Sequence, residues 1–242
     1  MVRVGGCSGA LVLAWCAMQG SVALADDSQP AQSAGPRWMF YAGAEVWRGG
    51  WSAHGGFIWS PQGLYEAGFA MKILSAGGVY HYMAGTTRTT GIYGLDAVMP
   101  GWRFKSGKLE VFAYLGLDLQ NHRTIPDDPG AQLRGFKTGA RLGVDAWYEP
   151  TETTMVAGSI SASTIGANFW SRAAYGWRVK DIAWVGPDVH VIASEVYQQY
   201  RIGAHATAFR TGRWEWSGGA GVFVDSDKVA GPYARLGVLV RY

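Results

Sequence analysis

The chain has 242 residues, with 21 Lys and Arg against 18 Asp and Glu, which gives a formal net charge of +3. This small excess implies no nucleic-acid or polyanion partner. Glycine (35) and tryptophan (12) are abundant, whereas charged residues make up only 16% of the chain, below the ~25% of an ordinary soluble domain. An exported soluble β-protein without disulfides would be more polar, so the composition disfavours that class.

Residues 1–25 have the pattern of a secretory signal peptide. A positive charge near the start precedes a small apolar stretch, and Ala23 and Ala25 supply an A-x-A cleavage site before two acids. The apolar stretch is shorter than the ~20 residues of a membrane-spanning helix. Both cysteines, Cys7 and Cys16, lie in this segment, so the mature chain has no thiol. A bulky neighbour, tryptophan, argues against lipid attachment at Cys16.

After a flexible N-terminal lead at 26–37, residues 38–242 form one domain of segments that alternate in polarity with a period of two, which predicts β-strands. We expect about twelve strands, with ten as the alternative count. Their lengths suit tilted strands that cross a bilayer, which needs ~9–11 residues. The predicted strands are Trp38–Arg48, Ala53–Ser60, Glu66–Met83, Thr89–Phe104, Lys108–Asn121, Gly135–Tyr148, Thr153–Thr164, Asn168–Val179, Ile182–Ala193, Tyr197–Arg210, Trp214–Asp225 and Gly231–Tyr242.

The facing of these strands predicts a membrane barrel. In "KLEVFAYLGLDLQ" (108–120) the odd positions are apolar throughout, and the even positions mix polar, glycine and aromatic residues. Arg141, Asp145 and Arg235 fall on the mixed face of other strands, where a soluble core would make their burial costly. A hydrated lumen tolerates them. We therefore expect an all-β, antiparallel up-and-down transmembrane barrel of the outer-membrane type.

The connections and the aromatic residues support this fold. Alternate connections are predicted to be short, and the others are mostly longer or more polar, as in outer-membrane barrels. The chain ends on Tyr242, which resembles the terminal aromatic that barrel assembly machinery reads. An interfacial girdle is predicted from tryptophans near the short turns, with Trp147 as a luminal alternative. They are Trp59, Trp102, Trp147, Trp177, Trp184, Trp214 and Trp216.

The inward positions form the candidate site. Their side chains either pair and fill the barrel or line a path for a carbohydrate. Twelve strands lie between the ~8 that side chains can fill and the ~16 that leave an aqueous channel, so both alternatives stay open. The candidate luminal residues are Phe112, Tyr114, Asp118, Gln120, Arg141, Asp145, His205, Tyr233 and Arg235.

Catalytic and metal motifs are not found. The histidines do not have the spacing of metal ligands, and no G-x-S-x-G elbow occurs. Asp127 and Asp128, in "PDDPG", fit an exposed acidic turn better than a carboxylate pair, with contact to a sugar or ion as the alternative. We predict no enzyme activity, cofactor or metal. The candidate loop residues are His122, Arg123, Asp127, Asp128 and Arg134.

Four blocks of sequence carry a resemblance to the cellulose biosynthesis protein BcsS family. They are "FYAGAEVWRGGWSAHGGFIWSPQGL", "PGWRFKSGKLEVFAYLGLDLQNHRTIPDDPGAQLRG", "STIGANFWSRAAYGWR" and "YRIGAHATAFRTGRWEWSGGAG". The similarity runs from about Phe40 to Tyr242. It implies a role in bacterial cellulose synthesis, at the outer membrane of a Gram-negative cell. It brings no catalytic residues.

The resemblance leads to one main hypothesis and two alternatives. The chain would be an outer-membrane barrel that assists export or surface assembly of a β-1,4-glucan. Alternatively it is a barrel hydrolase or acyl-modifying enzyme acting on glucan or lipid, or a closed scaffold that docks periplasmic synthase components through basic turns. The expected partners are cellulose, other cellulose synthase components, outer-membrane lipid and the barrel assembly machinery.

Overall fold

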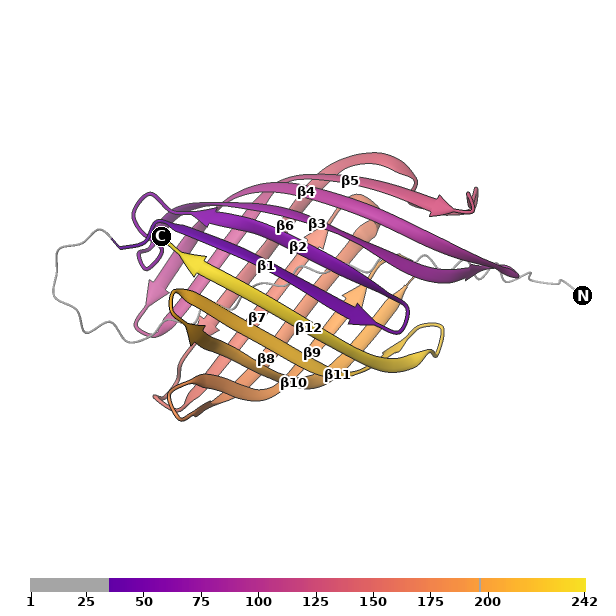
Figure 1. The fold of residues 1–242 in the computed structure, drawn as a ribbon. Coiled ribbons are helices and arrows are strands. Elements are labelled where there is room, and N and C mark those ends of the chain that lie inside the picture. The colour runs from indigo at the N-terminus through magenta and orange to yellow at the C-terminus, as the bar shows by residue number, and fades with distance from the viewer. Residues whose placement is uncertain (1–34, 196) are drawn as a thin grey trace, which may run out of the picture.

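The computed structural model describes residues 35–195 and 197–242, which form one closed barrel (Figure 1). Every strand pairs antiparallel with its neighbours in sequence, and the first strand pairs with the last. The predicted signal peptide, and nearly all of the predicted lead, lie outside the described residues. Within the described residues no helix has the length and apolar character to cross a membrane.

All twelve predicted strands are present, and the predicted boundaries differ from the observed ones by a few residues. The strands are β1 (Trp38–Trp47), β2 (Gly50–Trp59), β3 (Gly68–Ala84), β4 (Thr87–Ser106), β5 (Leu109–Ile125), β6 (Gly135–Tyr148), β7 (Thr154–Ser163), β8 (Asn168–Val179), β9 (Ala183–Ala193), β10 (Gln198–Thr211), β11 (Trp214–Asp225) and β12 (Ala230–Arg241). A short 3₁₀ turn, η1 (Ile165–Ala167), precedes β8. The largest differences are β2, which begins earlier than predicted, and β5, which continues to Ile125.

The two ends of the barrel differ less in loop length than we predicted. We call the end where β1 begins and β12 ends the terminus end, and the opposite one the far end. The far-end turns at 48–49 and 85–86 are tight, because the strands continue through residues that the sequence pattern assigned to loops. The asymmetry comes instead from the loop at 126–134 and from the length of β3, β4 and β5, which have 17, 20 and 17 residues.

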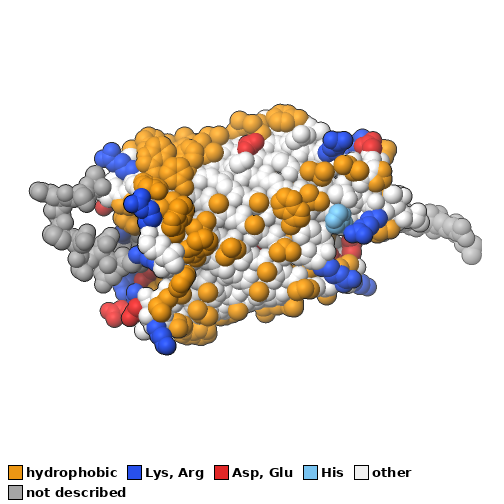
Figure 2. Space-filling view, in the orientation of Figure 1, with side chains coloured by type: hydrophobic (Ala, Val, Ile, Leu, Met, Phe, Trp, Pro, Cys, Tyr) orange, Lys and Arg blue, Asp and Glu red, His pale blue; other side chains and the backbone are white. Residues whose placement is uncertain are grey.

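The facing of the strands is confirmed. In β5, Leu115 and Leu117 point outward and are 57% and 48% exposed, whereas Asp118 is completely buried on the inside. Exposed aromatic side chains gather at the terminus end, where Figure 2 shows the densest apolar band. Trp102, Trp177 and Trp214 belong to it.

Two tryptophans that we assigned to this girdle lie elsewhere. Trp147 and Trp184 are 3% and 5% exposed and pack against each other inside the barrel, with ring centroids 6.4 Å apart. The luminal alternative for Trp147 is therefore the correct one. The girdle prediction was wrong for Trp184, because this residue shares its strand face with buried Asp188.

Tyrosines that lie over glycines account for much of the unusual composition. A methyl group at Gly91 would collide with the ring of Tyr80, and one at Gly143 would lie 2.5 Å from the Tyr114 ring. Each ring thus occupies the space that a side chain on the neighbouring strand would need. Large inward rings require small residues across the ladder, so the glycine and aromatic contents rise together.

One carboxylate lies on the wall that we expect to face lipid. Asp96 is exposed in β4, between Ile92 and Val98, which are both exposed outward. We expect Asp96→Leu to raise the free energy of unfolding in liposomes by ~1 kcal/mol, because charge on the lipid face is destabilising. The measurement is a urea titration, with Glu152→Leu at an exposed turn as the matched control. A less stable Asp96→Leu variant would contradict the assignment of this wall to lipid.

Candidate functional site in the barrel lumen

The lumen holds a set of ionisable and amide side chains that alternate with the outward residues along each strand. All nine predicted luminal residues point inward, and all but Asp145 are fully buried. Asp145 is partly buried and pairs with a lysine of β3. The roles of these residues depend on their contacts.

The first network is centred on Asp118 of β5. Arg141 of β6 and Ser163 of β7 both donate hydrogen bonds to Asp118 Oδ2. Gln120 Nε2 donates to the same oxygen over 2.9 Å, and Gln120 Oε1 lies 2.8 Å from His122 Nε2. This chain of contacts satisfies a charge that burial alone would strongly disfavour.

The second network is centred on Asp188 of β9, which we did not predict. Arg235 Nη2 donates to Asp188 Oδ2 over 2.6 Å, and Arg172 Nε donates over 3.3 Å. His190 Nε2 lies 3.2 Å from the same oxygen, and the Tyr233 hydroxyl donates to Oδ1 over 3.3 Å. One carboxylate thus lies between two guanidinium groups, in a completely buried position.

A third group combines charge with aromatic rings. Lys72 Nζ lies 3.1 Å from Asp145 Oδ2 and 4.4 Å from the centroid of the Tyr114 ring. The Tyr114 ring in turn packs against Phe112, with centroids 5.3 Å apart. The predicted aromatic faces of Phe112 and Tyr114 are therefore covered by neighbours rather than open to a passing sugar chain.

Three ion pairs reach across the barrel. Each joins strands that are three places apart around the ring of twelve, a quarter of its circumference, so each leaves the wall and cuts across one side of the lumen. The pairs are Lys72–Asp145 (β3 and β6), Arg201–Glu45 (β10 and β1) and Arg235–Asp188 (β12 and β9). An apolar cluster drawn from β1 to β5, β8, β9 and β12 adds packing in the same interior. Side chains of the wall therefore fill the middle of the lumen.

The predicted loop set divides into three environments. The loop begins only after Ile125, so His122 is a buried luminal residue of β5, and Arg123 is exposed on the outer side of that strand. Asp127 accepts two hydrogen bonds from Arg134 Nη2, at 2.6 and 2.7 Å. Asp128 instead accepts one from the Tyr82 hydroxyl at 2.7 Å. The two aspartates therefore have separate partners and do not form a carboxylate pair, and Asp128 is half-buried rather than exposed.

The histidines His205 and His122 and the loop carboxylate Asp128 lie apart from one another. His205 Nδ1 lies 2.9 Å from Thr207 Oγ1, and its Nε2 lies 3.1 Å from the backbone oxygen of Tyr175. His122 belongs to the Asp118 network, whereas Asp128 contacts Tyr82. In the described part of the chain, no three His, Cys, Asp or Glu side chains are grouped to hold a metal ion.

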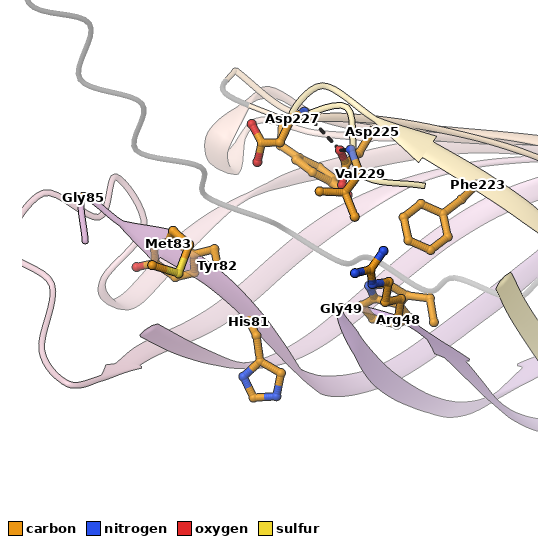
Figure 3. Close-up of a pocket in the computed structure, with 12 residues that line it drawn as sticks. Arg48, Gly49, His81, Tyr82, Met83, Gly85, Phe223, Asp225, Asp227 and Val229 are labelled. Carbon is orange, nitrogen blue, oxygen red and sulfur yellow. Dashed lines mark hydrogen bonds between the residues drawn. The ribbon is translucent and has the colours of Figure 1, made fainter. Parts of the chain in front are cut away.

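At the far end, the mouth of the barrel encloses a hollow of about 420 Å³ (Figure 3). Its lining comes from four separate chain segments, near 47–49, 81–85, 197 and 223–229. Four of its lining residues, Trp47, Tyr82, Tyr197 and Phe223, belong to a second cluster of buried rings. The sequence analysis missed this hollow, because its lining residues come together only when the barrel closes.

Comparison with known proteins identifies a family and a fold. The model of the family described as cellulose biosynthesis protein BcsS matches residues 39–242. No curated protein matches the chain.

Solved outer-membrane barrels share the fold. LpxR from Salmonella typhimurium is 7% identical over 84% of this chain and 100% of its own, with a TM-score of 0.50. The TodX monoaromatic hydrocarbon channel deltaS2 mutant is also 7% identical, over 85% of this chain and 90% of its own, at 0.50. The KdgM porin is 9% identical over 84% and 99%, at 0.48. At these identities the likeness shows the fold alone.

Proposed function

Because the chain belongs to the cellulose biosynthesis protein BcsS family, we propose that it is an outer-membrane barrel that assists surface assembly or export of the β-1,4-glucan. Its partners are then the glucan, other cellulose synthase components and outer-membrane lipid. The barrel assembly machinery would recognise the final strand, which ends beside Tyr242. The far end faces the outside of the cell, because it carries the extended ends of β3, β4 and β5 and the long loop at 126–134.

Between assembly and export, the three ion pairs across the lumen favour assembly. A glucan chain that passed through the barrel would have to separate Arg235 from Asp188 and Arg201 from Glu45, both of them buried pairs. Breaking buried pairs is strongly unfavourable when the charges gain no new partner. The open hollow at the far end offers contact with the glucan without that cost.

A closed scaffold that docks periplasmic components is the second candidate, and the same filled lumen favours it. The basic residues of the terminus end give it less support. Arg178 pairs with Asp181, and both Arg103 and Lys105 pair with Glu110. These charges are already partnered within the barrel, so they are poor evidence for an acidic docking partner.

The test is deletion of the gene in a cellulose-producing Gram-negative host, with glucan measured separately at the cell surface, in the periplasm and in the medium. We expect total glucan to persist while the surface material becomes reduced or disordered, and plasmid-borne wild-type protein to restore it. Glucan trapped in the periplasm would point to export. A fall in total synthesis would favour the scaffold, and an unchanged amount, location and order would refute a role in cellulose production.

A further inference from the structure

The far-end hollow brings polar groups together with buried aromatic rings and two exposed apolar side chains, Met83 and Val229. Trp47, Tyr82, Tyr197 and Phe223 are aromatic members of its lining, and Arg48, Asp225 and Asp227 are polar members. Figure 3 shows the two aspartates on one side, with Tyr82 and Arg48 on other sides of the space. The side chain of His81 points away from it. The volume falls within the ~300–1,000 Å³ of small-molecule sites.

The two aspartates have different roles. Asp225 Oδ1 accepts hydrogen bonds from the backbone nitrogens of Asp227 and Val229, and Asp225 Oδ2 accepts one from the Tyr197 hydroxyl. Asp225 therefore holds the β11–β12 loop in shape. The Asp227 side chain accepts no hydrogen bond from any described residue, so its carboxylate is available to a ligand.

The floor of the hollow is closed. The Arg201 guanidinium lies between two rings, 5.5 Å from the centroid of Trp47 and 5.2 Å from that of Tyr233. Arg201 also pairs with Glu45 over 2.8 Å. Trp47 is 5% exposed, so little of its ring lies open above this layer. A ligand in the hollow therefore rests on a packed floor and does not continue into the barrel.

This chemistry fits a sugar. A β-linked glucose ring presents C–H groups on its two flat faces, which pack against apolar side chains, and hydroxyl groups around its edge, which donate to carboxylates and accept from guanidinium groups. We propose that the far-end hollow binds the end of a β-linked glucose chain, with the exposed side chains of Met83 and Val229 as apolar contacts and Asp227 and Arg48 as edge contacts. The choice of glucose rests on the proposed function.

The experiment is calorimetric titration of the purified, detergent-solubilised chain with cellotetraose, with α-linked maltotetraose as the linkage control. We expect saturable binding of cellotetraose and weaker binding of maltotetraose. Met83→Ala should weaken binding about threefold, because it removes an exposed apolar side chain from the lining. Its matched control is Leu115→Ala, an exposed apolar side chain on β5 outside the hollow, which should change affinity less than about twofold.

A loop variant tests the polar contact without disturbing the strands. Asp227→Asn should weaken cellotetraose binding about threefold or more, through loss of a charged hydrogen bond, whereas Asp181→Asn at the opposite end should not. Absence of saturable binding, equal affinity for maltotetraose, or equal effects of hollow and control variants would each overturn the proposal. Binding without any cellulose defect on deletion would leave the hollow as a glucan site and refute only the proposed function. A cellulose defect without cellotetraose binding would refute the glucan site and leave the proposed function standing.

Discussion

Replacement of Asp188 by alanine is expected to lower the free energy of unfolding by ~3–5 kcal/mol, enough to prevent folding in a marginally stable barrel. The carboxylate is the common partner of Arg172 and Arg235, both of which are buried in the lumen. Its removal leaves two guanidinium groups close together without their counter-charge. Urea unfolding in detergent or liposomes measures the effect, and the shift in gel mobility of heated against unheated samples reports whether the barrel formed.

Two further variants isolate the charge of this residue. Asp188→Asn keeps the shape and one acceptor but removes the charge. Its free energy of unfolding should therefore lie between those of the wild type and Asp188→Ala. Asp181→Asn removes the charge of an exposed carboxylate that pairs with Arg178 at a turn, where an ion pair contributes ~0–1 kcal/mol, and asparagine tolerates the positive φ of this position. If Asp188→Asn proved no more harmful than Asp181→Asn, the luminal network would not hold the barrel together.

The strands and their facing could be predicted because their causes are local. A period of two places neighbouring side chains on opposite faces whatever the rest of the chain does. Leu115 and Leu117 therefore point outward and Asp118 points inward without reference to any partner strand. The same local signal was misleading at loop boundaries, because an extended far-end hairpin such as β3–β4 carries polar residues that look like a turn.

The partners of the inward residues could not be predicted, because they depend on register and closure. Asp188 meets Arg235, 47 positions later in the chain, only because β9 and β12 both belong to one closed ring. Trp184 illustrates the same limit, since its nearness to a short turn suggested an interfacial position. Its register on β9 instead turns its side chain into the lumen, where it packs against Trp147 of β6.

The glycine content shows how composition and structure are linked. From the sequence, glycine excess indicated only an unusual domain. In the structure, Gly91 and Gly143 are the places where the rings of Tyr80 and Tyr114 cross a neighbouring strand. These rings are members of the interior clusters. The glycines are thus part of what allows large side chains to fill the lumen.

The filled lumen predicts that the wild-type barrel, inserted in a planar bilayer, passes no steady ionic current. The fully buried pairs Arg201–Glu45 and Arg235–Asp188 occupy space that ions would need, and separating them is costly. Removing bulk from the apolar cluster should open a path, so Tyr114→Ala combined with Trp170→Ala is expected to produce discrete conductance steps. The matched control is Trp177→Ala with Tyr148→Ala, two exposed outward rings, which should leave the barrel silent.

Insertion has to be verified independently, because a protein that never enters the bilayer is also silent. Protease protection and heat-dependent gel mobility of the same proteoliposomes serve this purpose. Steady current through the inserted wild-type barrel would contradict the filled lumen and restore a path through it, and cello-oligosaccharide block of that current would then favour export. If the wild type passes no current and the variant with Tyr114→Ala and Trp170→Ala shows conductance steps, the barrel is closed by its own side chains. A glucan chain would then contact this protein at the hollow of its far end and would not pass through the lumen.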